Sequence, residues 1–203
     1  MLSNKHRGTL HLRIGPMFSS KSTWLNCEIT KLADIGFTCL KIIHADDDRP
    51  NVTCNSISGS THSSSFKSLS PAIHILKIKT LTEVNPLNYD VIGIDEAQFF
   101  PNLYEYINDW VENKGIHVRV VGLDGDFKKE KFGQILDIIP LCDEVVKLNA
   151  ICKLCLDELS QMNYKGNIMS ITAPFTKRIG SNLEQKEIGG YDKYIPVCRY
   201  HSY

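Results

Sequence analysis

The chain has 203 residues, of which 42% are hydrophobic and 23% are charged, and its basic and acidic side chains number 23 each. This length and composition predict one hydrophobic core with room for a small additional unit. Because the charges cancel, the field that attracts nucleic acid or an acidic membrane is absent, and we expect neither partner. No segment has the roughly 18 apolar residues of a membrane span or the pattern of a signal peptide, which predicts a cytoplasmic protein.

The first element combines a short apolar strand with a turn and a helix. Residues 10–23 read LHLRIGPMFSSKST, with Gly15 at the break and Lys21 entering the helix. This order is typical of a P-loop, G-x-x-x-x-G-K-[ST], whose backbone N–H groups surround a polyphosphate. Lys21 would neutralise phosphate charge, and Ser22 would contact Mg²⁺. Ser20 departs from the pattern because its position requires glycine, so a polar turn with a chance lysine is the alternative.

The remaining elements alternate between strands and helices. Residues 44–70 are polar and serine-rich, which predicts a long loop. Alternating elements with a phosphate turn after the first strand predict an α/β fold, a parallel sheet with helices on both faces. We expect strands over 37–43, 73–78, 89–95, 116–123 and 145–148, and helices over 21–35 and 103–113.

A second motif, VIGIDEAQFF at 91–100, ends an apolar run in two carboxylates. In P-loop proteins an acidic residue at the end of a neighbouring strand holds the Mg²⁺ shell, and Asp95 suits that role. Consecutive strand residues point to opposite faces, so Glu96 is free to act as a general base. The alternative is a pair of solvated carboxylates, but the preceding phosphate turn favours a nucleotide site.

A third motif pairs Cys152 and Cys155 with Cys198 and His201, each pair separated by two residues. These four side chains form the ligand set of a closed, structural Zn²⁺ site, although buried thiols are an alternative for either pair alone. The intervening residues 156–197 are too polar to form a core alone, so metal binding would contribute to their folding. We therefore expect a kinase-like domain over 1–150 and a zinc-anchored domain over 151–203, called the C-terminal segment below.

Taken together, these motifs resemble those of the type II thymidine kinases, the cellular and poxvirus-type family. The resemblance covers nearly the whole chain. It rests on GPMFSSKST at 15–23, DDR at 47–49, TH at 61–62, DEAQFF at 95–100, GLDGDFKKEKFG at 122–133, the two ligand pairs, FTKRIG at 175–180 and IGGYDKY at 188–194.

The resemblance implies that the protein transfers the γ-phosphoryl group of ATP to the 5′-hydroxyl of thymidine or deoxyuridine, giving dTMP for DNA synthesis. Glu96 would be the proton acceptor, and the C-terminal segment would form a lasso over the nucleoside. The ATP and Mg²⁺ residues implied are Gly15, Pro16, Met17, Phe18, Ser19, Ser20, Lys21, Ser22, Asp47, Asp48, Arg49, Asp95, Glu96, Ala97 and Gln98. The nucleoside residues implied are Phe127, Thr176, Gln185, Lys186, Glu187, Ile188, Gly189 and Tyr194.

Family members are usually tetramers inhibited by dTTP, so the resemblance implies both properties here. The chain departs from the family at Ser20, at an insertion near 160–173, in the spacing between DDR and TH, and at Gln185 and Glu187, which occupy usually apolar positions. One alternative is therefore a weak or inactive nucleotide-binding relative. Another is an unrelated P-loop protein whose zinc unit binds nucleic acid, which the zero net charge disfavours.

Overall fold

The computed structural model describes residues 7–47, 73–162, 171–181, 184–185 and 189–203. The expected loop over 44–70 lies outside these ranges from residue 48 onward, as do Asp48, Arg49, Lys186, Glu187 and Ile188 of the predicted site. Most of the insertion near 160–173 also lies outside them.

The central sheet has six strands in the order β3-β2-β4-β5-β1-β6, and every neighbouring pair is parallel. This arrangement confirms the predicted α/β fold, and each predicted strand matches an observed one to within two residues. The strands are β1 (Leu10–Ile14), β2 (Cys39–His44), β3 (Ile73–Ile78), β4 (Val91–Ile94), β5 (His117–Gly122) and β6 (Glu144–Lys147).

Continuous apolar runs explain why the inner strands lie at the centre. Every residue of β2 and of β4 is buried, as a parallel strand covered on both faces requires. The register sets Leu12 of β1 beside Val120 of β5 on one side and Val145 of β6 on the other. Because the strands are parallel, the turns after β1 and β4 open at the same edge of the sheet.

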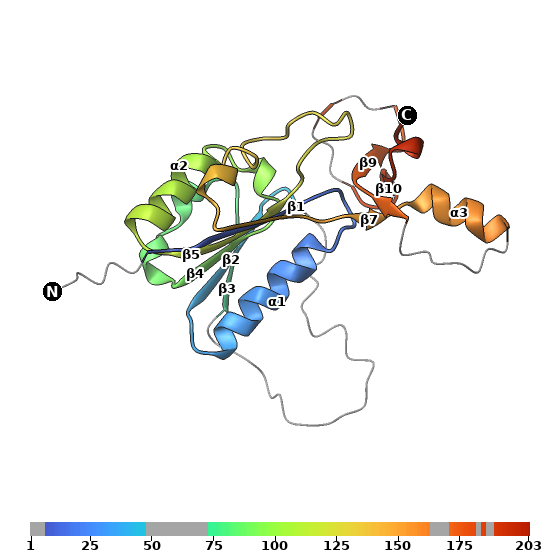
Figure 1. The fold of residues 1–203 in the computed structure, drawn as a ribbon. Helices are drawn as coiled ribbons and strands as arrows, with labels where there is room; N and C mark the ends of the chain where they lie inside the picture. Colours follow the sequence, from blue (N-terminus) through green and yellow to red (C-terminus); the bar gives the residue numbers. More distant parts are fainter. Residues whose placement is uncertain (1–6, 48–72, 163–170, 182–183, 186–188) are drawn as a thin grey trace, which may run out of the picture.

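Helices cover both faces of the sheet (Figure 1), as predicted. Helix α1 (Lys21–Asp34) buries Leu25, Ile29 and Ala33 against the sheet. Each such leucine or isoleucine contributes about 1.5–3 kcal/mol by burial. Helix α2 (Leu103–Asn108) lies on the opposite face and buries Leu103 and Ile107.

The sequence predicts one regular helix over 103–113, but its last turn, Asp109–Asn113, is a π-helix. The Lys114 N–H donates to the Asp109 carbonyl in this wider turn. The widening buries the neighbours Trp110 and Val111 together, because both pack into the main core. Tertiary packing therefore overrides the regular period here. None of the helices in the described ranges has the length and apolar character needed to cross a bilayer.

The C-terminal segment holds elements that the sequence analysis did not predict. Antiparallel pairs join β9 to β10 and β7 to β8, and a separate apolar cluster packs between them. The segment lies at the end of the sheet where β1 leads into α1 (Figure 1). Its elements are β7 (Ala150–Ile151), α3 (Lys153–Gln161), β8 (Thr172–Ala173), β9 (Phe175–Arg178) and β10 (Tyr194–Val197). Short 3₁₀ turns cover Leu81–Glu83, Pro86–Asn88, Ala97–Phe99, Ile139–Leu141 and Tyr200–Ser202.

Candidate active site

The turn between β1 and α1 has the backbone geometry of a phosphate cradle. Gly15 has a φ of 149°, and a Cβ there would lie 2.3 Å from the Leu148 carbonyl oxygen, so the position requires glycine. The Lys21 ammonium donates to the Pro16 carbonyl at 2.5 Å and to Ser19 Oγ at 3.3 Å. The predicted lysine is thus buried at the mouth of the turn, where α1 begins.

Ser20 precedes α1 and adopts the left-handed conformation, with φ 62° and ψ 24°. The P-loop pattern has glycine at this position, and glycine adopts this conformation without strain. The backbone geometry therefore explains the glycine that the pattern predicts here. A residue with a Cβ has a higher energy there by about 1–2 kcal/mol. Such strain persists only where the surrounding contacts hold it.

Asp95 follows β4 and contacts the P-loop across the sheet edge. Ser22 Oγ donates to Asp95 Oδ1 at 2.9 Å, and the Lys41 ammonium lies 3.8 Å from Asp95 Oδ2. The carboxylate is buried. Two hard oxygen donors at this separation, one hydroxyl and one carboxylate, fit the ligand preference of Mg²⁺. The structure therefore brings together the two residues that the sequence assigns to the metal.

Glu96 lies beyond the end of β4, so a turn places its side chain and not the alternation of a strand. Its backbone is left-handed with φ 51°, and its side chain lines the cavity described below. Gln98 Nε2 donates to Glu96 Oε2 at 2.7 Å, while the Leu123 N–H donates to Gln98 Oε1 at 3.0 Å. Gln98 therefore holds the Glu96 carboxylate in place from the strand β5 side.

A cavity of about 590 Å³, counting the part open to solvent, lies between the sheet edge and the C-terminal segment. Its lining includes eight predicted residues: Met17, Asp47, Glu96, Phe127, Thr176, Gln185, Gly189 and Tyr194. It also includes six that the sequence analysis missed: Phe99, Leu123, Gly125, Asp126, Phe132 and Arg178.

A second hollow of about 380 Å³ adjoins the first and reaches the P-loop. The two hollows share Gly125, Asp126 and Thr176, and the second also contacts Pro16. Thr176 lines both hollows. Its Oγ1 accepts a hydrogen bond of 2.9 Å from the Met17 N–H, which joins β9 to the turn after β1.

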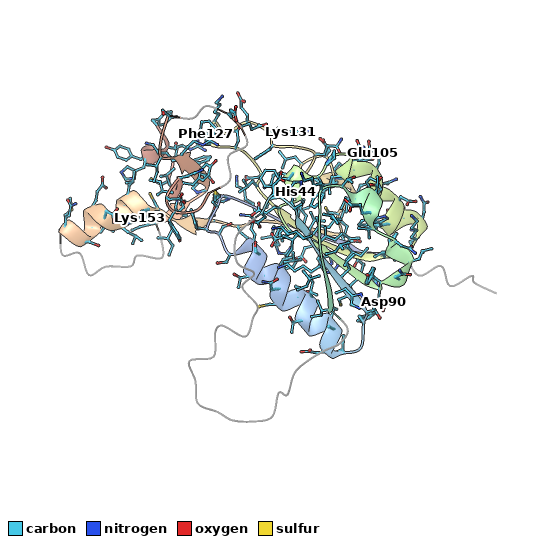
Figure 2. All side chains as sticks on the ribbon, turned by 180° about the vertical axis from the view of Figure 1, so that it is seen from behind. His44, Asp90, Glu105, Phe127, Lys131 and Lys153 are labelled. Carbon is cyan, nitrogen blue, oxygen red and sulfur yellow. The ribbon has the colours of Figure 1, made fainter. Side chains whose placement is uncertain are left out.

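Arg178 is the most consequential of the missed residues. Its guanidinium lies 4.0 Å from the centroid of the Phe127 ring and donates to the Tyr194 hydroxyl at 2.5 Å. It also donates to the Glu184 carbonyl at 2.6 Å. Figure 2 shows Phe127 beside the strands of the C-terminal segment, and Arg178 is the contact that fixes it there.

A sequence signal for Arg178 existed. Alternate residues of a strand share a face, so Arg178 lies on the same side of β9 as the predicted Thr176, and both are buried. Asp126 had a weaker signal in the turn-forming GLDGD sequence; its Oδ2 accepts a hydrogen bond of 2.9 Å from Gln185 Nε2.

The four predicted zinc ligands converge, with ligand atoms all within 4.8 Å of one another. His201 Nδ1 lies 3.5 Å from Cys152 Sγ, 3.4 Å from Cys155 Sγ and 3.5 Å from Cys198 Sγ. Tetrahedral Zn²⁺ with bonds of about 2.3 Å to sulfur and 2.0 Å to nitrogen places its ligands about 3.5–3.8 Å apart, so the residues fit the ion. Glu158 Oε1 lies 3.0 Å from His201 Nε2 and orients the ring.

Two other cysteines lie outside this cluster and pack into the core. Burial, with a smaller effect of Asp90, raises the pKa of Cys39 to about 11. Burial, with a smaller effect of Asp143, raises the pKa of Cys142 to about 12. Cys39 packs with Leu25 and Ile29, and Cys142 packs against the main core, so both serve as packing residues.

Comparison with known proteins agrees with this geometry. A family model described as thymidine kinase matches residues 8–202. The thymidine kinase of Yaba monkey tumor virus is 35% identical over 198 residues, which cover 97% of this chain and 95% of the relative. The human cytosolic thymidine kinase is 37% identical over 196 residues, covering 97% of this chain and 74% of the relative. The chicken cytosolic enzyme is 37% identical over 193 residues, covering 95% and 76%. The chain therefore belongs to the thymidine kinase family.

Proposed function

We propose that this protein transfers the γ-phosphoryl group of ATP to the 5′-hydroxyl of thymidine, and of deoxyuridine, giving the nucleoside monophosphate. The observation that carries this proposal is the convergence of a P-loop, the Ser22–Asp95 pair and the Glu96 carboxylate at one edge of the sheet. A kinase needs these parts together, because phosphoryl transfer depends on alignment and on charge neutralisation.

On the donor side, ATP would place its phosphates in the turn Gly15–Ser22, with the Lys21 ammonium as the charge partner. Ser22 and Asp95 would hold Mg²⁺, which supplies neutralisation of the phosphate oxygens. The hollow that reaches Pro16 is lined by Lys129 and Lys147 and also by Asp124 and Asp126, and Lys147 pairs with Asp124 at 2.5 Å, so the turn itself would supply most of the positive charge. Asp48 and Arg49, whose motif the resemblance assigns to ATP, are proposed to complete this side.

On the acceptor side, the nucleoside would occupy the larger cavity with its 5′-hydroxyl toward Glu96. The aromatic rings of Phe99, Phe127 and Phe132 give this cavity the apolar surface that a pyrimidine base stacks on. Glu96 would accept the hydroxyl proton as the oxygen attacks the γ-phosphorus. Tyr194, Gln185 and Gly189 line the cavity and would contact the base, and we propose that residues 185–189 do so largely through backbone groups.

Zn²⁺ at the Cys152, Cys155, Cys198 and His201 cluster would be structural, because these side chains fill all four positions of the tetrahedron. We propose that residues 151–203 form a zinc-anchored nucleoside-binding domain and residues 1–150 the nucleotide-binding domain. Support comes from the apolar cluster around Ala173 and Val197, most of whose members lie in residues 151–203, with Phe18 and Ala150 packing onto it from the other domain.

We further propose, on the family resemblance, a homotetramer in the cytoplasm that is inhibited by dTTP. The inhibitor dTTP fits the described layout, since a base in the larger cavity would leave the triphosphate toward the hollow that reaches the P-loop. The names of the human and chicken relatives, which are cytosolic, support the location.

An ATP-coupled assay across thymidine, deoxyuridine and deoxycytidine tests the proposal. We expect turnover of thymidine and deoxyuridine that requires Mg²⁺. We also expect that added nucleic acid does not compete with ATP for binding. No turnover by folded, zinc-loaded protein would contradict the proposal and support the inactive relative instead. The contact of Lys21 with the turn, the contact of Asp95 with Ser22 and the place of Glu96 in the cavity wall support the active alternative.

A further inference from the structure

The tip of the P-loop packs against the C-terminal segment. The Phe18 ring stacks on the Tyr191 ring, with centroids 3.8 Å apart and an angle of 17° between the planes. Beside this stack, the Met17 N–H donates to Thr176 Oγ1. Phe18 also packs against the apolar cluster that holds Cys152 and Val197. Residues far apart in the sequence, 159 positions for Met17 and Thr176, thus meet at the phosphate turn.

The contact matters because Phe18 is held in a strained conformation. Its φ is 65°, in the left-handed region that a bulky side chain rarely adopts, and Ser20 has the same feature two residues later. A strained residue keeps such a conformation only where its surroundings fix it. For Phe18 the fixing contacts are the Tyr191 stack and the apolar cluster, so the shape of the turn depends on the C-terminal segment.

Outside its stack on Phe18, Tyr191 is largely exposed to solvent. Its side chain is 67% exposed, so one face of the ring meets Phe18 and much of the remainder meets solvent. Its neighbours Gly189 and Tyr194 line the nucleoside cavity. Tyr191 therefore connects a strand that borders the nucleoside with the turn that cradles the phosphates.

We propose that Tyr191 is a positioning residue for ATP: by stacking on Phe18 it holds the phosphate turn in its binding conformation and couples that turn to the occupied nucleoside cavity. The inference rests on the proposed function, because it takes the turn as the ATP site. Coupling of this kind is reciprocal, so thymidine raises ATP affinity by the same factor by which ATP raises thymidine affinity.

The test uses the full-length, zinc-loaded protein and a non-hydrolysable ATP analogue titrated calorimetrically with and without thymidine. Tyr191→Ala is expected to raise the Kd of the analogue about 3- to 10-fold, the range given by the loss of one aromatic stack. It is also expected to abolish the effect of thymidine on that Kd. Tyr191→Phe keeps the ring and is expected to behave as the parent.

Ile179→Ala is the matched control, because Ile179 is an exposed apolar residue of the same segment, 49% accessible. In this variant the Kd of the analogue, measured with and without thymidine, should stay within about 2-fold of the parent. If Tyr191→Ala fails to fold, Phe18→Leu removes the stack while keeping apolar bulk, and the same rise in Kd is expected.

The outcomes distinguish failure of this inference from failure of the proposed function. Parent-like binding and coupling in Tyr191→Ala, or an equal loss in Tyr191→Phe, would overturn the inference. A parent protein that neither binds the analogue nor phosphorylates thymidine would overturn the proposed function, independently of Tyr191. A parent that does both, together with a selective loss in Tyr191→Ala, supports both.

Discussion

Individual residues of the P-loop carry backbone strain that the family pattern normally gives to glycine. Ser20 has a φ of 62° at the start of α1, directly before the Lys21 ammonium. The strained position is therefore adjacent to the ammonium that we propose neutralises phosphate. Relaxation of the serine backbone would move both a backbone N–H of the turn and the lysine.

We expect Ser20→Gly to raise turnover or ATP affinity several-fold, because glycine adopts this conformation without strain and about 1 Å of misplacement costs on the order of 100-fold in rate. Steady-state kinetics with varied ATP is the measurement. Thymidine affinity and zinc content should stay unchanged. Asn102→Gly is the control, since Asn102 precedes α2 with a φ of 56° and lies outside the cavity lining. Equal ATP constants for parent and Ser20→Gly would show that serine is tolerated.

Glu96→Gln is expected to lower kcat about 10²- to 10⁴-fold, the usual contribution of a general base. Glutamine keeps the size of the side chain and its hydrogen bond to Gln98, so the Kd values for ATP and thymidine should change little. Glu105→Gln on the exposed side of α2 (Figure 2) is the control. A kcat within about twofold of the parent would remove Glu96 from the proton-acceptor role.

At the scale of elements, the placement of α1 against the sheet decides where Lys21 lies. Gly93 of β4 makes close contact possible, because a Cβ there would lie 2.2 Å from Ile29 Cδ1 and 3.0 Å from Leu25 Cδ1. The same strand carries Asp95 two residues later. A change at this contact would therefore alter the distance between α1 and the Asp95 carboxylate, the proposed Mg²⁺ ligand.

Gly93→Ala is expected to destabilise the fold by about 1–3 kcal/mol through overpacking. It should also raise KM for ATP, because α1 would move away from β4. Urea unfolding followed by circular dichroism measures the first effect. Combining it with Ile29→Ala should recover part of the loss, since the smaller side chain makes room for the new Cβ. Strictly additive losses in the double variant would contradict this packing account.

For the whole molecule, the cluster of three cysteines and one histidine, our proposed zinc site, joins residues that are far apart in the chain. Cys152 and Cys155 begin the C-terminal segment, and Cys198 and His201 end it. The segment has a small apolar cluster of its own, whereas the sheet and its helices hold most of the core. The two parts should therefore differ in their dependence on metal.

We expect stoichiometric zinc in the purified protein, and Cys155→Ser or chelation should make the segment 156–197 protease-sensitive before the sheet domain unfolds. Limited proteolysis with mass spectrometry identifies the cleaved bonds. Cys142→Ser is the control, because Cys142 is a protonated core thiol outside the cluster. Absence of zinc on metal analysis, or equal protease resistance without it, would contradict a structural site.

The sequence alone determined the sheet and much of the site, because these depend on local patterns. Apolar runs ending in Gly15 and Asp95 predict strands whose carboxyl ends meet at one edge, and the structure confirms that the Ser22 and Asp95 side chains make contact. The cysteine and histidine spacing likewise predicts convergence of the four ligands. The roles expected for Asp48 and Arg49, which lie outside the described residues, remain predictions.

The tertiary structure decided what depends on residues distant in the chain. Arg178 orders Phe127 and Tyr194 through contacts between separate elements, and Phe18 meets Tyr191 across most of the sequence. The alternation along β9 places Arg178 on the same face as Thr176, but it does not identify the partners of Arg178 or of Phe18, because each contact depends on the path of the whole backbone. Local propensity places strands and turns, but only packing of the folded chain decides which side chains share a cavity and which strained dihedral angles are held.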